Sequence, residues 1–276
     1  MTAPFVSTDW LAEHIDDAGI AIVDASWYLP NANRDAHAEY RQGHIPGAVF
    51  FDIDGIADTT TDLPHMLPSP ADFARMAGAM GISEAQTIVV YDETGLFSAP
   101  RVWWTFRTMG APDVRILAGG GAKWRAESRP IESGEAPRPA GTFTPAFRAD
   151  SVRGYAEMRA NVDAPAFQVA DARPAARFAG TAPEPRPGLA AGHIPGSLSA
   201  PAGDLTNGAL LKSADELRAI FAAAGIDLDK PIVTSCGSGV TAAVLLLALE
   251  TAGAGDVALY DGSWAEWGAR PGAPVE

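Results

Sequence analysis

The sequence has 276 residues, 47% of them apolar, and a formal net charge of −14. This length exceeds one compact core and predicts two domains, since domains of roughly 100 to 150 residues are the commonest. The acidic charge argues against nucleic acid and anionic membranes as partners, because both bind basic surfaces. The longest apolar run, Ala242 to Leu249, is much shorter than the roughly 20 residues that a spanning helix needs. The N-terminus lacks a basic stretch followed by an apolar run, so we expect a cytoplasmic protein.

Short β-branched strands alternate with helical segments in the first half of the chain. Strands are predicted near Ala21 to Asp24, Thr87 to Tyr91 and Val114 to Leu117. The segment from Ser69 to Met80 has the start signal and the apolar periodicity of a helix. From Glu127 to about Asp150 the chain is rich in Pro, Gly and Ser and has no apolar period, which predicts a linker.

The second half repeats this alternation. Strands are predicted near Phe167 to Val169, Ile232 to Thr234 and Val257 to Leu259. Between the first two, Ser213 to Glu216 resembles a capping box, and the apolar residues after it fall on one helical face that stops at Gly225. Such alternation is typical of an α/β fold with a mostly parallel sheet and helices on both faces.

Four segments of the first half recur, in the same order, in the second half, which indicates a duplicated domain. We therefore expect an N-terminal domain over residues 1–138, a linker at 139–150 and a C-terminal domain over 151–276. The matched pairs are Ile22 to Ala25 with Val169 to Ala172, Gly43 to Ala48 with Gly192 to Ser197, Ile88 to Asp92 with Ile232 to Cys236, and Asp113 to Trp124 with Asp256 to Trp267.

Cys236 is the only cysteine of the chain, so an internal disulfide and a multi-cysteine metal site are excluded. It directly follows a predicted strand, and ligands of α/β sheets bind at the carboxyl ends of strands. We therefore regard Cys236 as a candidate nucleophile; the alternative is an inert core thiol. The five histidines are scattered, so we expect neither a metal site nor a cofactor.

The loop after the cysteine fits nucleophilic chemistry. Gly237 and Gly239 allow the turn to curl so that backbone N–H groups point inward and form an anion-binding nest, in which Ser238 also lies. The helix that begins near Val240 and Thr241 adds its positive end, and both effects favour the attacking thiolate. A phosphatase loop of the Cys-x5-Arg type is excluded because Ala242 stands six residues after Cys236.

The cysteine loop, the paired Gly-His-Ile-Pro-Gly motifs and the duplication resemble the tandem rhodanese family over essentially the whole chain. In that family, thiosulfate sulfurtransferases typically carry a basic Cys-Arg-Lys-Gly-Val-Thr loop. The 3-mercaptopyruvate sulfurtransferases carry Cys-Gly-Ser-Gly-Val-Thr, the form found here. The resemblance implies two rhodanese-like domains and an enzyme that takes sulfur from 3-mercaptopyruvate as a Cys236 persulfide and releases pyruvate. Without a second cysteine, the sulfur must pass to an external thiol, a thioredoxin or cyanide.

Three arginines lie in a Pro-rich loop upstream of the second Gly-His-Ile-Pro-Gly motif. Guanidinium groups bind carboxylates bidentately, so the loop suits an α-keto acid. By resemblance to the family, Arg177 and Arg186 match the substrate-binding pair, whereas Arg173 matches no binding position.

The resemblance also implies a proton relay. Asp54 and His65 of the first half match a set that, with Ser238, forms a Ser-His-Asp arrangement at the domain interface, in which serine passes protons rather than attacks. The first half has Asp92 where the second has Cys236, so it cannot form a persulfide, and we expect it to wall the site.

Other recurring polar residues suit a structural role. His44 and His193 occur in both halves, as do Asp24 and Asp171, so they more plausibly tie loops to the sheets than perform chemistry. Phe97 stands where some relatives carry tyrosine, which removes a phenolic contact to the substrate.

Three other activities fit parts of the sequence. Thiosulfate could be the donor, although the neutral Gly237 and Ser238 favour a mono-anionic keto acid. A sulfur-relay protein without a small-molecule donor would not need Arg177 and Arg186. A redox-sensing thiol would leave the duplication and the arginines unexplained.

Overall fold

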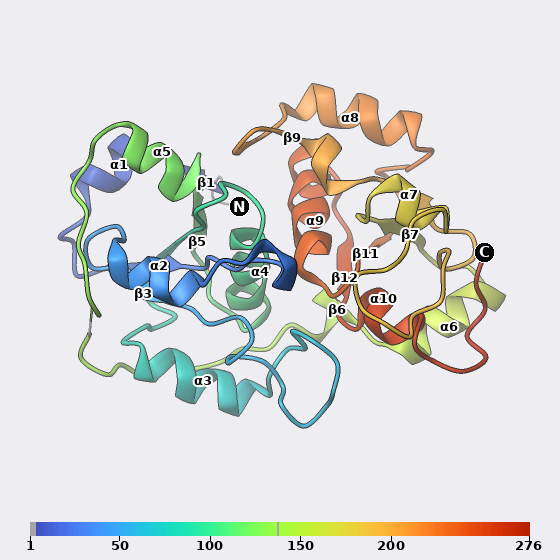
Figure 1. The fold of residues 1–276 in the computed structure, drawn as a ribbon, viewed down its shortest axis with the longest axis horizontal. Helices are drawn as coiled ribbons and strands as arrows, with labels where there is room; N and C mark the ends of the chain where they lie inside the picture. The colour runs from blue at the N-terminus through green and yellow to red at the C-terminus, as the bar shows by residue number, and fades with distance from the viewer. Residues whose placement is uncertain (1–3, 137) are drawn as a thin grey trace. The chain divides into compact units, whose positions relative to one another are not determined.

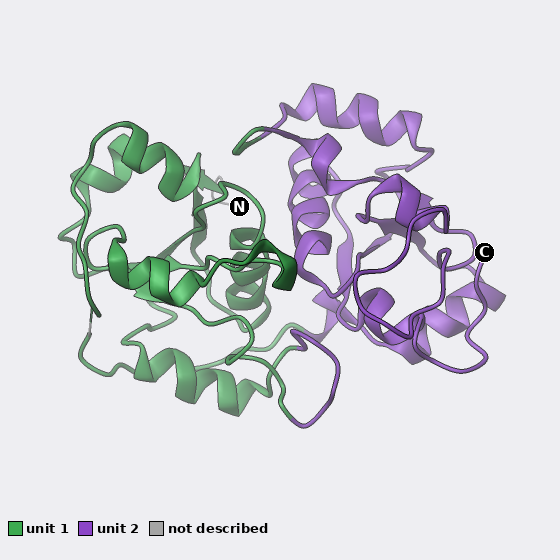
Figure 2. Cartoon of the chain, viewed as in Figure 1, with its two compact units in different colours: residues 1–59, 67–148, 208–210 green, residues 60–66, 149–207, 211–276 purple. Residues whose placement is uncertain are grey.

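The computed structural model describes residues 4–136 and 138–276. They form two units, coloured separately in Figure 2, and each unit contains one five-stranded parallel sheet. The α/β architecture predicted from the alternation of strands and helices is therefore confirmed. The first unit holds the described residues up to Thr59, Leu67–Arg148 and Gly208–Leu210, and the second holds Thr60–Met66, Ala149–Asn207 and Leu211–Glu276.

The sheet of the first unit has the order β1-β5-β4-β2-β3. Its central strand, β4 (Thr87–Tyr91), pairs in parallel with β2 (Ile20–Asp24) and β5 (Val114–Leu117). These strands are buried along almost their whole length, as expected of a parallel sheet flanked by helices (Figure 1). The other elements are β1 (Phe5–Val6), α1 (Thr8–Glu13), η1 (Pro30–Ala32), α2 (Ala36–Gln42), β3 (Val49–Phe50), α3 (Pro70–Ala79), α4 (Ala99–Thr108) and α5 (Gly120–Ala126).

The sheet of the second unit has the corresponding order, β6-β12-β11-β7-β8. Its central strand, β11 (Ile232–Ser235), pairs in parallel with β12 (Val257–Tyr260) and β7 (Gln168–Asp171). A short hairpin of β9 (Thr206–Asn207) and β10 (Leu210–Leu211) lies outside both sheets. The other elements are η2 (Ala149–Ser151), β6 (Val152–Arg153), α6 (Tyr155–Asp163), α7 (Ala175–Phe178), β8 (Leu198–Ser199), η3 (Ala202–Leu205), α8 (Ala214–Ala223), α9 (Val240–Ala252) and α10 (Ser263–Trp267).

The duplication extends to strand register. Asp24 of β2 lies opposite Tyr91 of β4, and Asp171 of β7 lies opposite Ser235 of β11. In both units the residue after the central strand is the one singled out by the repeat, Asp92 in the first and Cys236 in the second. The internal repeat therefore places these two residues at the same point of the fold.

Both predicted helix starts are confirmed. Ser69 caps α3 by accepting the Asp72 N–H, and Ser213 caps α8 in a capping box with Glu216. α9 is buried on nearly every side, which explains the apolar run from Ala242 to Leu249 as an interior helix. Among the described residues, no helix combines the length and apolarity needed to traverse a bilayer.

The segment expected to act as a linker packs onto the first unit as far as Arg148. Phe143 is 3% exposed and packs edge-on against Phe73, with ring centroids 5.2 Å apart. The Gly141 N–H donates to the carbonyl of Gly78 at 2.8 Å. One aromatic side chain is enough to anchor an otherwise polar stretch, and a periodicity test does not detect a single anchor.

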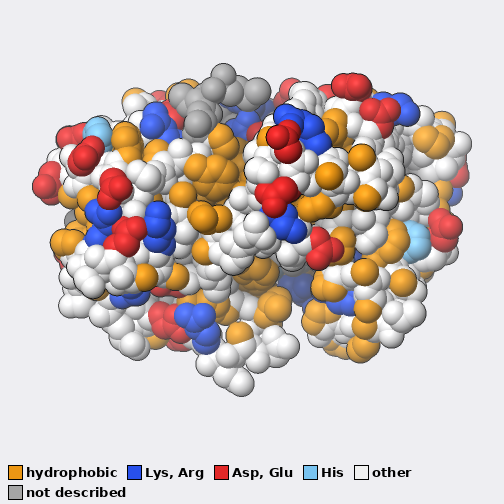
Figure 3. Space-filling view, turned by 90° about the horizontal axis from the view of Figure 1, so that it is seen from above, with side chains coloured by type: hydrophobic (Ala, Val, Ile, Leu, Met, Phe, Trp, Pro, Cys, Tyr) orange, Lys and Arg blue, Asp and Glu red, His pale blue; other side chains and the backbone are white. Residues whose placement is uncertain are grey.

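Charges of opposite sign lie close together on the surface. On the face shown in Figure 3, most basic side chains lie next to acidic ones. Exposed pairs such as Arg159 with Asp163 and Lys123 with Glu127 repeat this pattern along single helices. The expectation that nucleic acid is not a partner, which rests on the net charge, stays a prediction.

The repeated aspartates meet different partners. Asp171 receives two hydrogen bonds from the guanidinium of Arg173, from Nε at 3.0 Å and from Nη2 at 2.8 Å. Asp24 has Ser26 at the corresponding place and accepts its N–H at 2.9 Å. Burial raises the pKa of Asp24 from 3.8 to about 6, against the hydrogen bonds from Ser26 and Tyr91 that lower it. The first unit therefore buries a carboxylate without an arginine partner.

Asp24→Asn should stabilise the first unit at neutral pH relative to the wild type. The pKa of Asp24 is raised in the folded state, so its favourable contribution is complete below about pH 4 and is lost as the pH rises through 6. The shift corresponds to about 3 kcal/mol. The variant's free energy of unfolding, minus that of the wild type, should rise by up to this amount between pH 4 and pH 7 in urea titrations.

Asp171→Asn is the matched control. It removes one of the two carboxylates that pair with the buried Arg173, leaving Glu184, and should destabilise the second unit by roughly 1–3 kcal/mol at pH 7. A difference between the Asp24→Asn variant and the wild type that does not change with pH would contradict the assignment of a raised pKa to Asp24.

Candidate active site

Cys236 directly follows the central strand of the second unit, at its carboxyl end, and is 2% exposed. Its carbonyl accepts the N–H of Trp264 at 2.9 Å, and its own N–H donates to the hydroxyl of Ser263 at 3.2 Å. The carbonyl of Gly237 accepts the N–H of Ala265 at 2.8 Å. The start of α10 thus fixes both peptide groups that flank the cysteine.

The two loop glycines meet different needs. Gly239 caps α9 with a φ of 80°, in the left-handed region where a Cβ is unfavourable. Gly237 has no such φ, but a Cβ built there would lie 3.1 Å from Nη2 of Arg177. The expectation that both glycines serve to curl the loop is therefore correct only for Gly239. Gly237 makes room for a guanidinium.

The loop keeps hydrogen-bond donors unused by the protein. Within residues 4–136 and 138–276, the N–H groups of Gly237 and Ser238 donate to no acceptor. Val240 and Thr241 open α9, where the first-turn N–H groups lack carbonyl partners inside the helix. Ser238 is buried, at 7% exposed. The anion-binding nest expected at this loop stays a prediction.

In the corresponding loop of the first unit, the backbone N–H donors already have an acceptor, the side chain of Asp92. The Asp92 carboxylate accepts hydrogen bonds from the backbone N–H groups of Thr94, Gly95 and Phe97, and from two more at the start of α4. The Thr94 hydroxyl donates to it as well, at 2.9 Å. The chain supplies its own anion to this loop, where Asp92 stands in place of the cysteine and already occupies the backbone donors.

A chain of alternating charges lies beside the cysteine loop. Arg173 is 1% exposed, pairs with Asp171, and donates from Nη1 to Glu184 at 2.7 Å. Its guanidinium also lies over the ring of Trp264, 4.1 Å from the centroid. Every polar edge of Arg173 is therefore engaged, in agreement with the absence of a binding role for it in the sequence.

Glu184 connects this chain to Arg177. Its side chain is 3% exposed, and its Oε2 accepts from both Nε and Nη2 of Arg177. Arg177 is 21% exposed on its side chain and lies against Gly237. One substrate-binding candidate is therefore held at the cysteine loop by a buried carboxylate.

His65 and Arg186 lie together in the second unit. Nη2 of Arg186 is 3.4 Å from Nε2 of His65. Because arginine can only donate, Nε2 is the acceptor in this contact, which assigns the ring proton to Nδ1. His65 is 5% exposed and has a φ of 60°, an uncommon backbone conformation for a residue other than glycine. Such conformations cluster at functional sites.

Asp54 belongs to the first unit, where the indole N–H of Trp27 donates to its carboxylate at 2.9 Å. Trp27 stacks on Phe97, with ring centroids 6.1 Å apart. Phe97 thus serves to pack the tryptophan that holds Asp54. The predicted relay of Asp54, His65 and Ser238 draws on residues of both units and stays a prediction.

The Gly-His-Ile-Pro-Gly motifs are fixed in the same way in both units. His44 stacks on Tyr40, and His193 stacks on Phe178, with ring centroids 4.0 and 3.8 Å apart. The Nδ1 atom of each histidine lies within 2.9 Å of the backbone carbonyl of its aromatic partner. These contacts fit the structural role expected of both histidines. Glu132 and Glu276 complete the two loops by accepting the N–H groups of Gly47 and Gly196.

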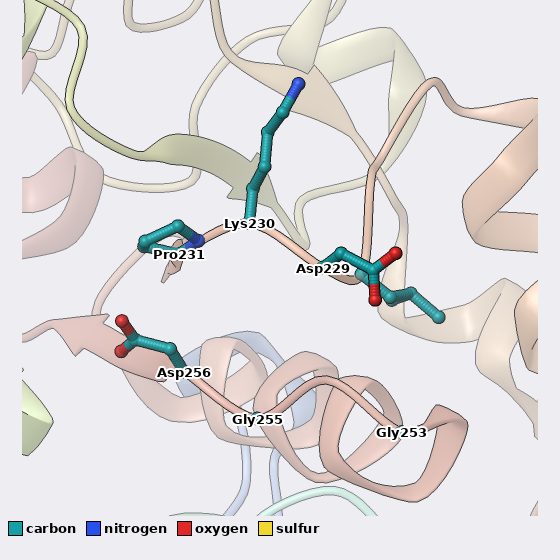
Figure 4. A pocket seen from close by; sticks show the side chains of 7 residues that line it. Asp229, Lys230, Pro231, Gly253, Gly255 and Asp256 are labelled. Atoms are coloured by element: carbon teal, nitrogen blue, oxygen red, sulfur yellow. The ribbon is translucent and has the colours of Figure 1, made fainter.

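A hollow of about 360 Å³ lies at the opposite edge of the second sheet (Figure 4). It is lined by residues at the amino ends of β11 and β12, among them Asp229, Lys230 and Asp256. Lys230 extends away from Asp256 in this view and pairs with Asp227 at 3.3 Å. Parallel α/β sheets bind their ligands at the carboxyl edge, where Cys236 lies, so we assign no chemistry to this hollow.

Residues 7–127 and 155–270 each match the rhodanese-like domain. This chain belongs to the rhodanese family. Two matches spanning most of the chain, on two sheets of one topology, make it a tandem rhodanese. The sequence resemblance is thereby confirmed.

Relatives similar to this rhodanese carry two names. The chain is 50% identical to the 3-mercaptopyruvate sulfurtransferase of Escherichia coli K12, over 100% of this chain and 98% of that protein. It is 44% identical to a thiosulfate sulfurtransferase of Cricetulus griseus, over 95% and 91% of the two chains. The crystal structure of the 3-mercaptopyruvate sulfotransferase SseA from Escherichia coli superposes on this chain with a TM-score of 0.88 at 48% identity, over 95% of this chain and 99% of that chain.

Two residues of this rhodanese site, Glu184 and Ser263, carried no sequence signal of their own. Ser263 has a φ of 48°, and its counterpart in the first unit, Gly120, has a φ of 60°. A Cβ at Gly120 would lie 2.3 Å from the carbonyl oxygen of Asp92. The second unit tolerates a strained serine there, and its hydroxyl holds the N–H of Cys236. Aligning Gly120 with Ser263 through the internal repeat would have singled out this position.

Replacing Ser263 should separate backbone strain from the hydroxyl contact. Ser263→Ala keeps the strained φ and leaves the buried Cys236 N–H without its acceptor, at a cost of about 1–3 kcal/mol. Ser263→Gly loses the same acceptor but relieves the strain, so it should be more stable than the Ala variant by about 1 kcal/mol. Both variants should form the Cys236 persulfide more slowly than the wild type. Recovery of the rate in the Gly variant would show that the hydroxyl is not needed.

Proposed function

We propose that this protein is a 3-mercaptopyruvate sulfurtransferase, which carries sulfur as a persulfide on Cys236. The observation that supports the donor most directly is the neutral loop with Arg177 lying against Gly237. The 50% identity to a 3-mercaptopyruvate sulfurtransferase over the whole chain supports the same donor. A loop without its own cations, served by guanidinium groups from a neighbouring segment, suits a mono-anionic keto acid.

The first half-reaction begins with the Cys236 thiolate attacking the sulfur of 3-mercaptopyruvate. A sulfur–sulfur bond forms, the carbon–sulfur bond breaks, and its electron pair leaves with the three-carbon fragment as pyruvate enolate. The N–H groups of Gly237, Ser238, Gly239 and Val240, with that of Thr241, stabilise the negative charge on the outer sulfur.

Substrate binding rests on the arginine pair. Arg177 and Arg186 hold the carboxylate and the keto oxygen, which orients the carbon–sulfur bond toward Cys236. Arg186 approaches His65 at 3.4 Å, so the same arginine lies beside both the keto acid and the proposed proton carrier.

A proton must then reach the enolate carbon. We infer that this proton is the one of the substrate thiol, and that, by analogy with the family, it passes through Ser238 and His65 to the enolate carbon, which leaves the outer sulfur negatively charged. In this analogy Asp54 orients the imidazole.

The second half-reaction needs an external acceptor. The chain has one cysteine and cannot displace its own outer sulfur as a disulfide. A small thiol, a thioredoxin or cyanide attacks the outer sulfur and returns Cys236 as a thiolate, so ping-pong kinetics are expected. The cytoplasmic location expected from the N-terminal residues stays a prediction.

The donor half-reaction can be tested by mass spectrometry of the intact protein after brief exposure to 3-mercaptopyruvate. The wild type should gain the mass of one sulfur atom and release an equal amount of pyruvate, whereas Cys236→Ser should do neither. A gain with thiosulfate but not with 3-mercaptopyruvate would replace the proposed donor. No gain with either would favour a relay protein that is loaded by a partner.

Gly237→Ala tests the contact between Arg177 and the loop. The backbone at this position accommodates alanine, but the new methyl group would lie 3.1 Å from Nη2 of Arg177 and displace it by a few tenths of an ångström. We expect KM for 3-mercaptopyruvate to rise roughly 5-fold, the equivalent of about 1 kcal/mol, with persulfide still formed. Gly255→Ala is the control, because no atom lies within 4 Å of a Cβ built there. An unchanged KM in the Gly237→Ala variant would show that Arg177 does not bind substrate from this position.

A further inference from the structure

Arg177 is a flexible side chain that has to present its guanidinium beside Cys236. Of the five N–H donors of a guanidinium, those on Nε and Nη2 that reach Glu184 fix the plane of the group. The remaining donors, which include both of those on Nη1, stay available for a ligand. The orientation of this arginine is thus decided by one carboxylate.

That carboxylate is itself immobilised. Glu184 is buried, and its second oxygen accepts from Arg173 at 2.7 Å. Arg173 is fixed in turn by Asp171, by the carbonyl of Gly192 at 2.9 Å and by the ring of Trp264. A buried glutamate between two arginines satisfies its charge on both oxygens and cannot rotate without leaving a buried charge unpaired.

The charge chain is connected to the nucleophile at two points. At one end, Arg177 lies against Gly237. At the other end, Arg173 lies over the indole ring of Trp264, and the backbone N–H of Trp264 donates to the carbonyl of Cys236. A shift of Glu184 would therefore move the arginine relative to the sulfur that attacks.

We propose that Glu184 is the positioning residue for substrate: it holds Arg177 in the orientation that receives the donor's carboxylate. This proposal rests on the proposed function, in which Arg177 binds that carboxylate. Glu184 itself touches neither the substrate nor the sulfur. Its effect should therefore depend on whether the donor carries a carboxylate.

Glu184→Gln keeps the size of the side chain and removes its charge, so Arg177 loses a charged acceptor. We expect kcat/KM for 3-mercaptopyruvate to fall roughly 10- to 100-fold. With mercaptopropanone, the same keto thiol without its carboxylate, kcat/KM should stay within about 2-fold of the wild type. Glu39→Gln is the matched control, since Glu39 also pairs with an arginine, Arg34, in the first unit.

A second readout separates this proposal from the proposed function. The dissociation constant of pyruvate, which carries the same carboxylate, should rise by a similar factor in the Glu184→Gln variant. If the wild type binds pyruvate but forms no persulfide from 3-mercaptopyruvate, the proposed donor fails while the pyruvate titration still tests Glu184. Equal losses with both donors, an unchanged pyruvate affinity, or tighter pyruvate binding would each overturn the positioning role.

A shorter carboxylate covers the case in which the glutamine variant does not fold. Glu184→Asp keeps a negative charge for the buried Arg173 but is one methylene too short to reach both arginines. It should lose less activity with 3-mercaptopyruvate than the glutamine variant and keep its activity with mercaptopropanone. A full loss with both donors in a folded aspartate variant would show that Glu184 does not act through the donor's carboxylate and would overturn the positioning role.

Discussion

Both units must satisfy the same constraint: the central strand of a parallel sheet ends, and the backbone turns into a helix whose first N–H groups have no carbonyl partners. Buried donors without acceptors cost free energy, so something must approach them. The first unit places the carboxylate of Asp92 among them. The second has Cys236 at this position, and the N–H groups of Gly237 and Ser238 keep no acceptor among the described residues. In the proposed mechanism these donors serve an anion that the reaction itself creates on the cysteine sulfur.

The duplication also places a buried aspartate at the same strand end in each unit, and the two aspartates have different hydrogen-bond partners. In the first unit Asp24 has only hydroxyl and amide donors, and burial raises its pKa. In the second unit Asp171 is paired with Arg173, and that pairing continues through Glu184 to Arg177. Because each buried charge requires a neutralising neighbour, one ion pair at the sheet extends into an ordered chain that ends at the cysteine loop. The ion pair that neutralises Asp171 at the sheet and the proposed substrate-binding arginine are thus parts of one network.

The features that could be predicted from the sequence were those with a local signal: a repeated segment, an alternation of strands and helices, or a residue type that occurs once. Repetition indicated two domains, and alternation indicated parallel α/β sheets; the lone Cys236 in a Gly-Ser-Gly loop indicated the nucleophile. Positions that depend on packing across distant segments were not predictable. Glu184 sits in a Pro-rich loop like any solvated carboxylate, and only the fold shows that it is buried between two arginines. Phe143 likewise anchors a stretch whose composition is that of a linker.

Among the described residues, each unit holds two residues other than glycine with a left-handed φ, and in the second unit both of them contact candidate site residues. Ser263 holds a φ of 48° where the first unit has a glycine, and His65, with a φ of 60°, packs with the second unit although it precedes it in the chain. Each such residue costs about 1–3 kcal/mol and persists only where its surroundings fix it. Ser263 is fixed by its contact with the N–H of Cys236, and His65 by its contact with the guanidinium of Arg186. The unit that keeps its donors available therefore also holds strained residues against the cysteine and its arginine, whereas the first unit satisfies its loop with Asp92 and relaxes the position of Ser263 to glycine.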